Sequence, residues 1–277
     1  MISPAFDADY VQPSRAGQTR TRSSGKFAAA FTLVELLVAM SILAMLALVV
    51  GQIVGLTSES ASVNSKRLDG MGQVRVALDW IGSDMAGRLK RTDVGHGCTK
   101  AIGNDVVGFY SEVDSYSGSR RVAAVGYRIQ ETDIGRGQPF QLERGVEGTS
   151  WAVNGGVRFL QAFPVIADAD YETLADSILR LEFCYLKTDG TLSNSASSDL
   201  SDVSAIVVAF AVLDSTSRKI VSESDLGQLS GGLPDTIEGQ DPISGWHAAY
   251  ADPAFATGVP RPAIQGLRFA QRYFYVR

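Results

Sequence analysis

Residues 30–56 read AFTLVELLVAMSILAMLALVVGQIVGL, and the only charged side chain among them is Glu35. From Leu36 to Leu56 the polar side chains are limited to Ser41 and Gln52, which a helix tolerates. A helix needs about 20 apolar residues to cross the hydrocarbon core of a bilayer. The run is longer than the apolar region of an ordinary secretory signal, which has about 7–15 residues. It therefore predicts a membrane helix that remains in the mature protein.

Charge is distributed unevenly on the two sides of this helix. The whole chain has a formal net charge of −5. The part before Ala30 has a balance of +2, which leaves −7 for the remainder; its charged residues are Arg15, Arg20, Arg22, Lys26, Asp7 and Asp9. A basic tip before an acidic body is expected when the tip stays in the cytoplasm and the body is exported. The acidic body also disfavours nucleic acid as a partner, because phosphate binding needs clustered Lys and Arg.

Glu35 is an ionisable residue at the start of an otherwise apolar segment. A carboxylate inside a bilayer costs about 3 kcal/mol unless it is paired, so such a residue is a candidate functional site. The alternative is a carboxylate at a helix end that reaches the lipid headgroups. The residues around Glu35 decide between the two.

The run Ala30-Phe31-Thr32-Leu33-Val34-Glu35 resembles the type III signal of type IV pilins and type II secretion pseudopilins. In that family a prepilin peptidase cuts before the phenylalanine, on the cytoplasmic side, and methylates the new amine. The resemblance implies cleavage between Ala30 and Phe31, N-methylation of Phe31 and a role for Glu35 in subunit assembly. The chain departs from the family at Ala30, where glycine is usual, which implies slower processing.

Physical chemistry agrees with this assignment of roles. Cleavage would create a positive amine at Phe31, one helical turn from Glu35. The carboxylate can then pair with the amine of its own subunit or of a neighbour, and an unpaired carboxylate would be penalised. The pair would therefore set the register between subunits.

The helix is expected to continue beyond the membrane, from about Leu33 to Arg91. An apolar stripe recurs at helical spacing through Met71, Val74, Leu78, Ile81, Met85 and Leu89. We expect this stripe to pack against a globular head. The predicted organisation is a cleaved leader (1–30), a transmembrane part (31–56), an amphipathic part (57–91) and a periplasmic β-rich head (92–277).

Short β-type runs follow the helix, which predicts an α+β fold in which the helix packs on an antiparallel sheet, as in pilins. The candidate strands are Val106–Val113, Arg121–Gln130, Phe140–Val146, Ser177–Lys187, Val203–Leu213 and Ile264–Val276. Thr188-Asp189-Gly190 predicts a turn. Residues 222–262 are the least regular region, predicted to hold a short helix around His247–Phe255 or to form a functional surface loop.

The head strands also resemble those of particular relatives. Residues 125–129, 142–146, 179–185 and 203–213 are similar to strands of J-type pseudopilins and PilW-like minor pilins. Residues 267–277 resemble the last strand of a cassette of prepilin-like proteins from Verrucomicrobia.

Cysteine and histidine are scarce. In an exported domain Cys98 and Cys184 favour one disulfide, although their spacing does not show whether they meet. His96 and His247 are interpreted as surface or packing residues, and a zinc site lacks ligands.

A calcium contact at Asp168, Asp170, Glu172 and Asp176 is weighed against a solvated acidic turn, which the missing loop glycine favours. Enzyme motifs are also missing, so no catalytic residue, metal or cofactor is predicted.

The sequence therefore predicts a minor pilin or pseudopilin that catalyses nothing. The resemblance implies as partners other pilins or pseudopilins, a prepilin peptidase and an inner-membrane assembly platform. An alternative is a membrane-anchored periplasmic binding protein or enzyme with an uncleaved anchor. A third possibility, a subunit of a DNA-uptake pilus, is disfavoured by the acidic head.

Overall fold

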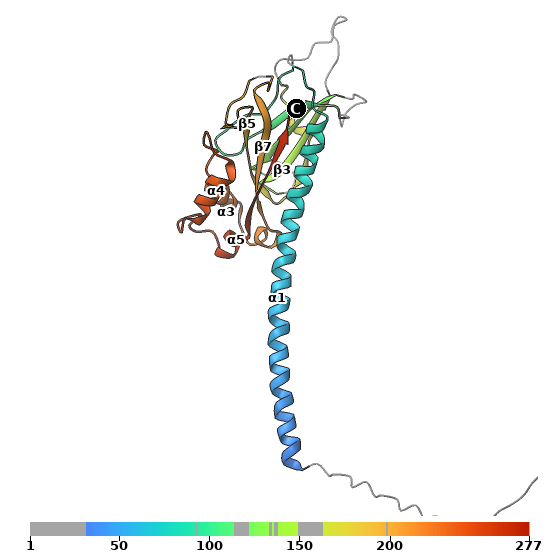
Figure 1. Ribbon diagram of the computed structural model, residues 1–277, viewed down its shortest axis with the longest axis vertical. Coiled ribbons are helices and arrows are strands. Elements are labelled where there is room, and N and C mark those ends of the chain that lie inside the picture. The colour runs from blue at the N-terminus through green and yellow to red at the C-terminus, as the bar shows by residue number, and fades with distance from the viewer. Residues whose placement is uncertain are drawn as a thin grey trace, which may run out of the picture. The chain divides into compact units, whose positions relative to one another are not determined.

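The computed structural model describes residues 32–91, 94–113, 122–132, 135, 138–148, 163–197 and 199–276, with the backbone alone for residues 56–69. The chain divides into two compact units, Met1–Leu56 and Thr57–Arg277, which we call the amino-terminal unit and the head. Helix α1 (Leu33–Ala86) runs from the first unit into the second (Figure 1). The predicted α+β class, a long amino-terminal helix and a head of antiparallel sheets, is confirmed.

Helix α1 ends at Ala86, before the predicted end at Arg91. The reason is that the chain after Ala86 joins the first sheet. The backbone N–H of Leu89 donates to the carbonyl of Tyr110 at 2.9 Å, on strand β1 (Val107–Ser111). Tertiary pairing with a strand therefore overrides the local helical pattern, in which Leu89 belonged to the apolar stripe.

The first sheet contains four antiparallel strands in the order β1-β2-β3-β4. The further strands are β2 (Ala123–Gln130), β3 (Gln141–Gly148) and β4 (Tyr171–Ala175), with a short 3-10 helix η1 (Asp168–Asp170) before β4. Strands β2 and β3 pair antiparallel, with Tyr127 opposite Arg144. Strand β4 was missed, because it is short and its exposed Glu172 and Thr173 interrupt the apolar pattern.

The second sheet has the order β6-β5-β7-β8, again antiparallel. Its strands are β5 (Ile178–Lys187), β6 (Leu192–Ser193), β7 (Val203–Leu213) and β8 (Leu267–Tyr275). The predicted turn after β5 is present, and Gly190 provides its positive φ of 86°. Strand β8 begins after the predicted Ile264, because the residues before it form a helix.

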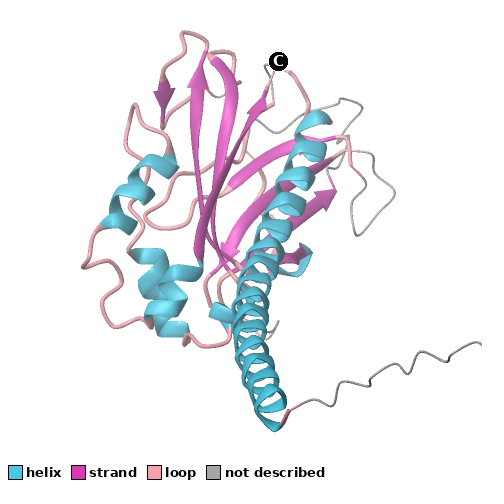
Figure 2. Cartoon of the chain, turned by 60° about the horizontal axis from the view of Figure 1, so that its bottom comes forward, coloured by secondary structure: helices cyan, strands magenta, loops and turns pink. Residues whose placement is uncertain are grey.

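The connection from β7 to β8 is helical, which corrects the prediction of an irregular region. It contains α2 (Ser215–Arg218), α3 (Glu223–Gly231), α4 (Pro242–Ala251) and α5 (Arg261–Gly266) (Figure 2). Ser222 and Asp225 form a capping box at the start of α3, and the side chain of Asp241 caps α4. Each such cap contributes about 1 kcal/mol to helix stability. The predicted short helix around His247–Phe255 corresponds to the second half of α4.

The core of the head lies on both faces of the second sheet. On one face α1 buries Val74, Leu78, Ile81 and Met85, four members of the predicted stripe. On the other face Trp246 of α4 packs against Phe269 of β8, with ring centroids 5.5 Å apart. The other two stripe residues differ, since Met71 is partly exposed and Leu89 lies outside the helix. The stripe is therefore core, as predicted, only between residues 74 and 85.

Candidate functional site

The first turn of α1 holds the carboxylate of Glu35 beside Thr32. The backbone N–H and the hydroxyl of Thr32 each donate to Oε2 of Glu35 at 3.4 Å. In return the N–H of Glu35 donates to the Thr32 hydroxyl at 3.2 Å. This reciprocal arrangement is a capping box, which starts the helix at Leu33. Ala30 and Phe31 lie outside the described residues.

The segment Leu33–Gly55 of α1 is long and apolar enough to cross a membrane by length and composition, with a mean hydropathy of 2.7 and no buried residue. Its one serine is satisfied within the helix, since the Ser41 hydroxyl donates to the carbonyl of Leu37 at 2.9 Å. A continuous apolar surface of this size is not stable in water, so it needs lipid or other helices around it. Glu35 is the one charged side chain in this segment.

Residues 26–51 match the family described as the prokaryotic N-terminal methylation motif. The chain carries a prokaryotic N-terminal methylation motif. The match confirms the predicted resemblance to type IV pilins and pseudopilins over this pilin-type segment, which includes Glu35 and most of the apolar run. The finer likeness of the head strands to J-type pseudopilins and PilW-like minor pilins stays a prediction.

A solved structure of a type IV-like pilin from Thermus thermophilus is similar to the chain with 12% sequence identity and a TM-score of 0.39, over 74% of this chain and 95% of that one. A TM-score of this size does not establish a common fold. No curated protein matches the chain significantly in sequence. The pilin-type segment therefore carries the functional argument.

Both cysteines are free thiols in the structure, so the predicted disulfide is not formed. Cys98 interacts with the hydroxyl of Tyr185, the residue that follows Cys184 on β5. Consecutive side chains of a strand point to opposite faces of the sheet, so the two thiols lie on opposite sides of β5. Burial raises the pKa of Cys98 to about 11 and that of Cys184 to about 12, which keeps both thiols protonated and unreactive.

The two histidines pack against aromatic rings in different parts of the head. His96 lies edge-on to Tyr185 with centroids 6.1 Å apart, and His247 lies edge-on to Phe269 at 5.2 Å. Burial lowers the pKa of His96, which favours the neutral ring. Such contacts fit the predicted packing role.

Asp168 and Asp176, which lie before and after β4, have different partners. Asp168 forms an ion pair with Arg128 at 2.7 Å, and Asp176 accepts a hydrogen bond from Ser177 at 3.0 Å. Within the part of the chain that the structure describes, no group of three or more His, Cys, Asp or Glu residues is arranged to hold a metal ion.

One buried ionic cluster joins α1 to the first sheet and was missed from sequence. Asp84 of α1 is buried and accepts hydrogen bonds from Nε and Nη2 of Arg144 at 2.8 Å and 3.0 Å. The hydroxyl of Tyr127, opposite Arg144 in the sheet, also donates to Asp84. The sequence placed Asp84 off the apolar stripe, and only the fold supplies its partners.

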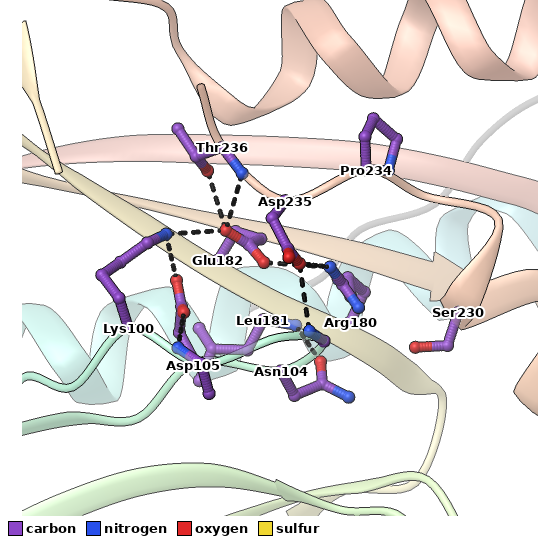
Figure 3. A network of polar contacts seen from close by, with 12 residues as sticks. Lys100, Asn104, Asp105, Arg180, Leu181, Glu182, Ser230, Pro234, Asp235 and Thr236 are labelled. Carbon is purple, nitrogen blue, oxygen red and sulfur yellow. Dashed lines mark hydrogen bonds and ion pairs between the residues drawn. The ribbon is translucent and has the colours of Figure 1, made fainter. Parts of the chain in front are cut away.

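A second buried ionic cluster lies at the edge of β5 (Figure 3). Glu182 contacts Lys100 at 2.8 Å and Arg180 at 3.0 Å, and Arg180 contacts Asp235 at 2.5 Å. Lys100 also contacts Asp105 at 2.6 Å. The signal in the sequence was the presence of Arg180 and Glu182 in the otherwise apolar strand ILRLEFCYLK. Taken alone, such an alternation predicts that one face of the strand is open to water.

Proposed function

We propose that this chain is a minor pilin or pseudopilin subunit of a type IV pilus-like or type II secretion filament. The observation that carries the proposal is the pilin-type segment, in which one carboxylate lies in the first turn of an apolar helix segment with no buried side chain. The helix anchors the subunit in the bacterial inner membrane and then packs among the helices of its neighbours. The head lies in the periplasm and contacts other subunits or cargo.

Cleavage between Ala30 and Phe31 gives Glu35 a stronger partner than it has in the uncleaved chain. The hydrogen bonds from Thr32 are long, at 3.4 Å, and come from uncharged donors. Bonds from a charged donor are shorter and roughly twice as strong. The carboxylate therefore exchanges the cap for the methylated amine of Phe31, in its own subunit or in the neighbour, and the exchange fixes the register of assembly.

The partners follow from this role. A prepilin peptidase produces the mature end, an inner-membrane assembly platform inserts the subunit, and other pilins or pseudopilins surround its helix. The long head, with four helices inserted between β7 and β8, suits a subunit that occupies few positions in the filament better than one repeated throughout it. No catalytic reaction and no nucleic-acid partner is part of the proposal.

The mature amino terminus tests the class. The chain is expressed in a host with a prepilin peptidase and purified from membranes, and its intact mass and amino-terminal sequence are measured. We expect a start at Phe31 with the added mass of one methyl group. The variant Ala30→Gly restores the usual family residue and should be cut at least as completely. A start at Met1, or a cut beyond Leu56, would indicate an uncleaved anchor or a secretory signal and contradict the filament proposal.

Glu35→Ala tests the assembly role. The variant should insert and be cleaved normally, while its share in the sheared filament fraction, measured by immunoblot against the membrane fraction, falls about tenfold or more. The reason is that removing one partner of a buried ion pair costs about 3–5 kcal/mol. Glu35→Gln keeps the shape and should fail equally, whereas Ser41→Ala, in the same helix, should assemble normally. Normal incorporation of Glu35→Ala would refute the register role.

A further inference from the structure

Lys100 and Asp105 lie in direct contact next to a second carboxylate, in the cluster of Figure 3. Nζ of Lys100 is 2.6 Å from Oδ2 of Asp105 and 2.8 Å from Oε2 of Glu182. Its remaining hydrogen bond goes to the carbonyl of Phe183 at 2.8 Å. An amine and two carboxyl groups are thus held at reacting distance within one small site.

Water is largely excluded from this site. The side chains of Asp105 and Glu182 are both fully buried, and that of Lys100 is 23% exposed. The ring of Phe183 covers the amine, with its centroid 5.0 Å from Nζ. Burial raises the pKa of Asp105 to about 7, and the neighbouring charge of Glu182 adds to the effect. Near neutral pH Asp105 is therefore partly the uncharged acid.

We propose that Lys100 and Asp105 become joined by an isopeptide bond between Nζ and the side-chain carboxyl carbon. Glu182 accepts one proton from Nζ, and the neutral amine attacks the carboxyl carbon of protonated Asp105. The C–N bond forms as the C–O bond to Oδ2 breaks. Glu182 passes that proton to the leaving hydroxyl, which departs as one water, and then accepts the second proton that Nζ loses. The product is a neutral amide, and no oxidant, reductant or cofactor takes part.

The surrounding hydrogen bonds suit each step. The backbone N–H of Ala101 donates to Oδ1 of Asp105 at 3.0 Å, where negative charge develops during the attack. The N–H of Phe183 donates to Oδ2 at 3.0 Å. Glu182 is held by the N–H and hydroxyl of Thr236 at 3.2 Å and 2.8 Å and by Arg180 at 3.0 Å. These donors fix the Glu182 carboxyl group beside the amine.

The head contains a matched pair that lacks these conditions. Lys187 and Asp202 are also in contact, but the Asp202 side chain is 42% exposed. Hydrogen bonds from Lys187 and Ser197 lower the pKa of Asp202, so this carboxyl group stays ionised and is not an electrophile. Contact between lysine and aspartate is therefore not sufficient, and only the Lys100 pair should react.

Mass spectrometry of the mature full-length chain tests the proposal. We expect an intact mass lighter by one water than the sequence requires. In a tryptic digest, cleavage after Lys100 should be lost, and the peptide from Thr92 to Arg120 should be lighter by one water. Cleavage after Lys187 should be complete in the same digest. An unmodified mass with normal cleavage after Lys100 would overturn the proposal.

Two variants separate the isopeptide from other losses of water. K100R keeps the positive charge but removes the amine, and should show the full mass. If K100R still loses water, the product is a succinimide at Asp105 and the proposal fails. E182Q keeps the shape and should also show the full mass, with folding checked by tryptophan fluorescence. A folded E182Q that is linked as completely as the parent, or a link from Lys100 to Glu182, would overturn the assigned roles.

Discussion

In the Leu33–Gly55 segment of α1 every side chain is exposed, whereas later in the same helix Val74, Ile81 and Met85 are buried in the head. The two regions also differ in how they hold carboxylates. The first segment has one carboxylate, held by the hydroxyl and N–H of Thr32. The head instead buries carboxylates with arginine or lysine partners. Helix α1 therefore lies in two environments. The head surrounds its later part with protein, whereas the Leu33–Gly55 segment has no protein around it.

The head has a core of its own, and the apolar segment has none. In the described part of the head, α1 and the second sheet bury apolar side chains against each other, and Asp84 and Glu182 have basic partners within the same unit. In the amino-terminal unit, the apolar surface must be covered by lipid or by other helices. Mutations in the head should therefore change its own stability, and mutations in the apolar segment should change insertion and assembly.

The largest expected effect on the head is that of Asp84→Ala. This change removes the buried carboxylate that contacts Arg144 at 2.8 Å, and breaking a buried ion pair by removing one partner costs about 3–5 kcal/mol. Urea unfolding of the full-length protein in detergent, followed by tryptophan fluorescence, measures the loss, because all three tryptophans lie after residue 56.

Asp79 provides the matched control for Asp84. It lies on the same helix and contacts Arg272 at 2.7 Å, but the side chains are 58% and 48% exposed. Asp79→Ala should cost about 1 kcal/mol or less, because water screens the exposed pair. Equal losses for the two variants would show that burial does not decide the strength of these pairs.

Truncation of isoleucine at two points of α1 sharpens the comparison further. Ile81 is fully buried and Ile42 is 56% exposed. Ile81→Ala should destabilise the head by about 2–5 kcal/mol, because it removes apolar contacts and leaves a cavity. Ile42→Ala should leave the urea midpoint of the head unchanged. A loss of head stability in Ile42→Ala would contradict the division into two units.

Sequence patterns predicted those parts of the fold that rest on local periodicity. The start of α1 at Leu33 and the bounds of β7 at Val203–Leu213 agree with the structure. Both segments are long and strongly apolar, and each has the length and composition of one type of element, a membrane-length helix for α1 and a buried strand for β7. The signals for α3 and α4 were present as the caps Ser222 and Asp241, but the helices are short and their apolar pattern is weak.

The parts that sequence did not predict depend on contacts between distant residues. Whether Cys98 meets Cys184 depends on which side of β5 each thiol lies on. The spacing of the two cysteines along the chain does not contain that information. Arg144, the partner of Asp84, lies 60 positions along the chain. The partners of Glu35 are local by contrast: Thr32 contacts it in the structure, and the amine expected at Phe31 is four positions away.

The smallest expected effect concerns Asp202, the exposed counterpart of the buried pairs. Hydrogen bonds from Lys187 and Ser197 lower the pKa of Asp202 below its ordinary value of 3.8. A lowered pKa means that the stabilisation is present above 3.8 and is lost as the pH falls toward the pKa of the folded state. Near neutral pH, Asp202→Asn should therefore cost about 1 kcal/mol or less, because the pair is partly exposed. The difference from the parent, measured by urea unfolding at several pH values, should shrink on acidification. A difference that stays constant below pH 3.8 would show that Asp202 acts through shape rather than through its charge.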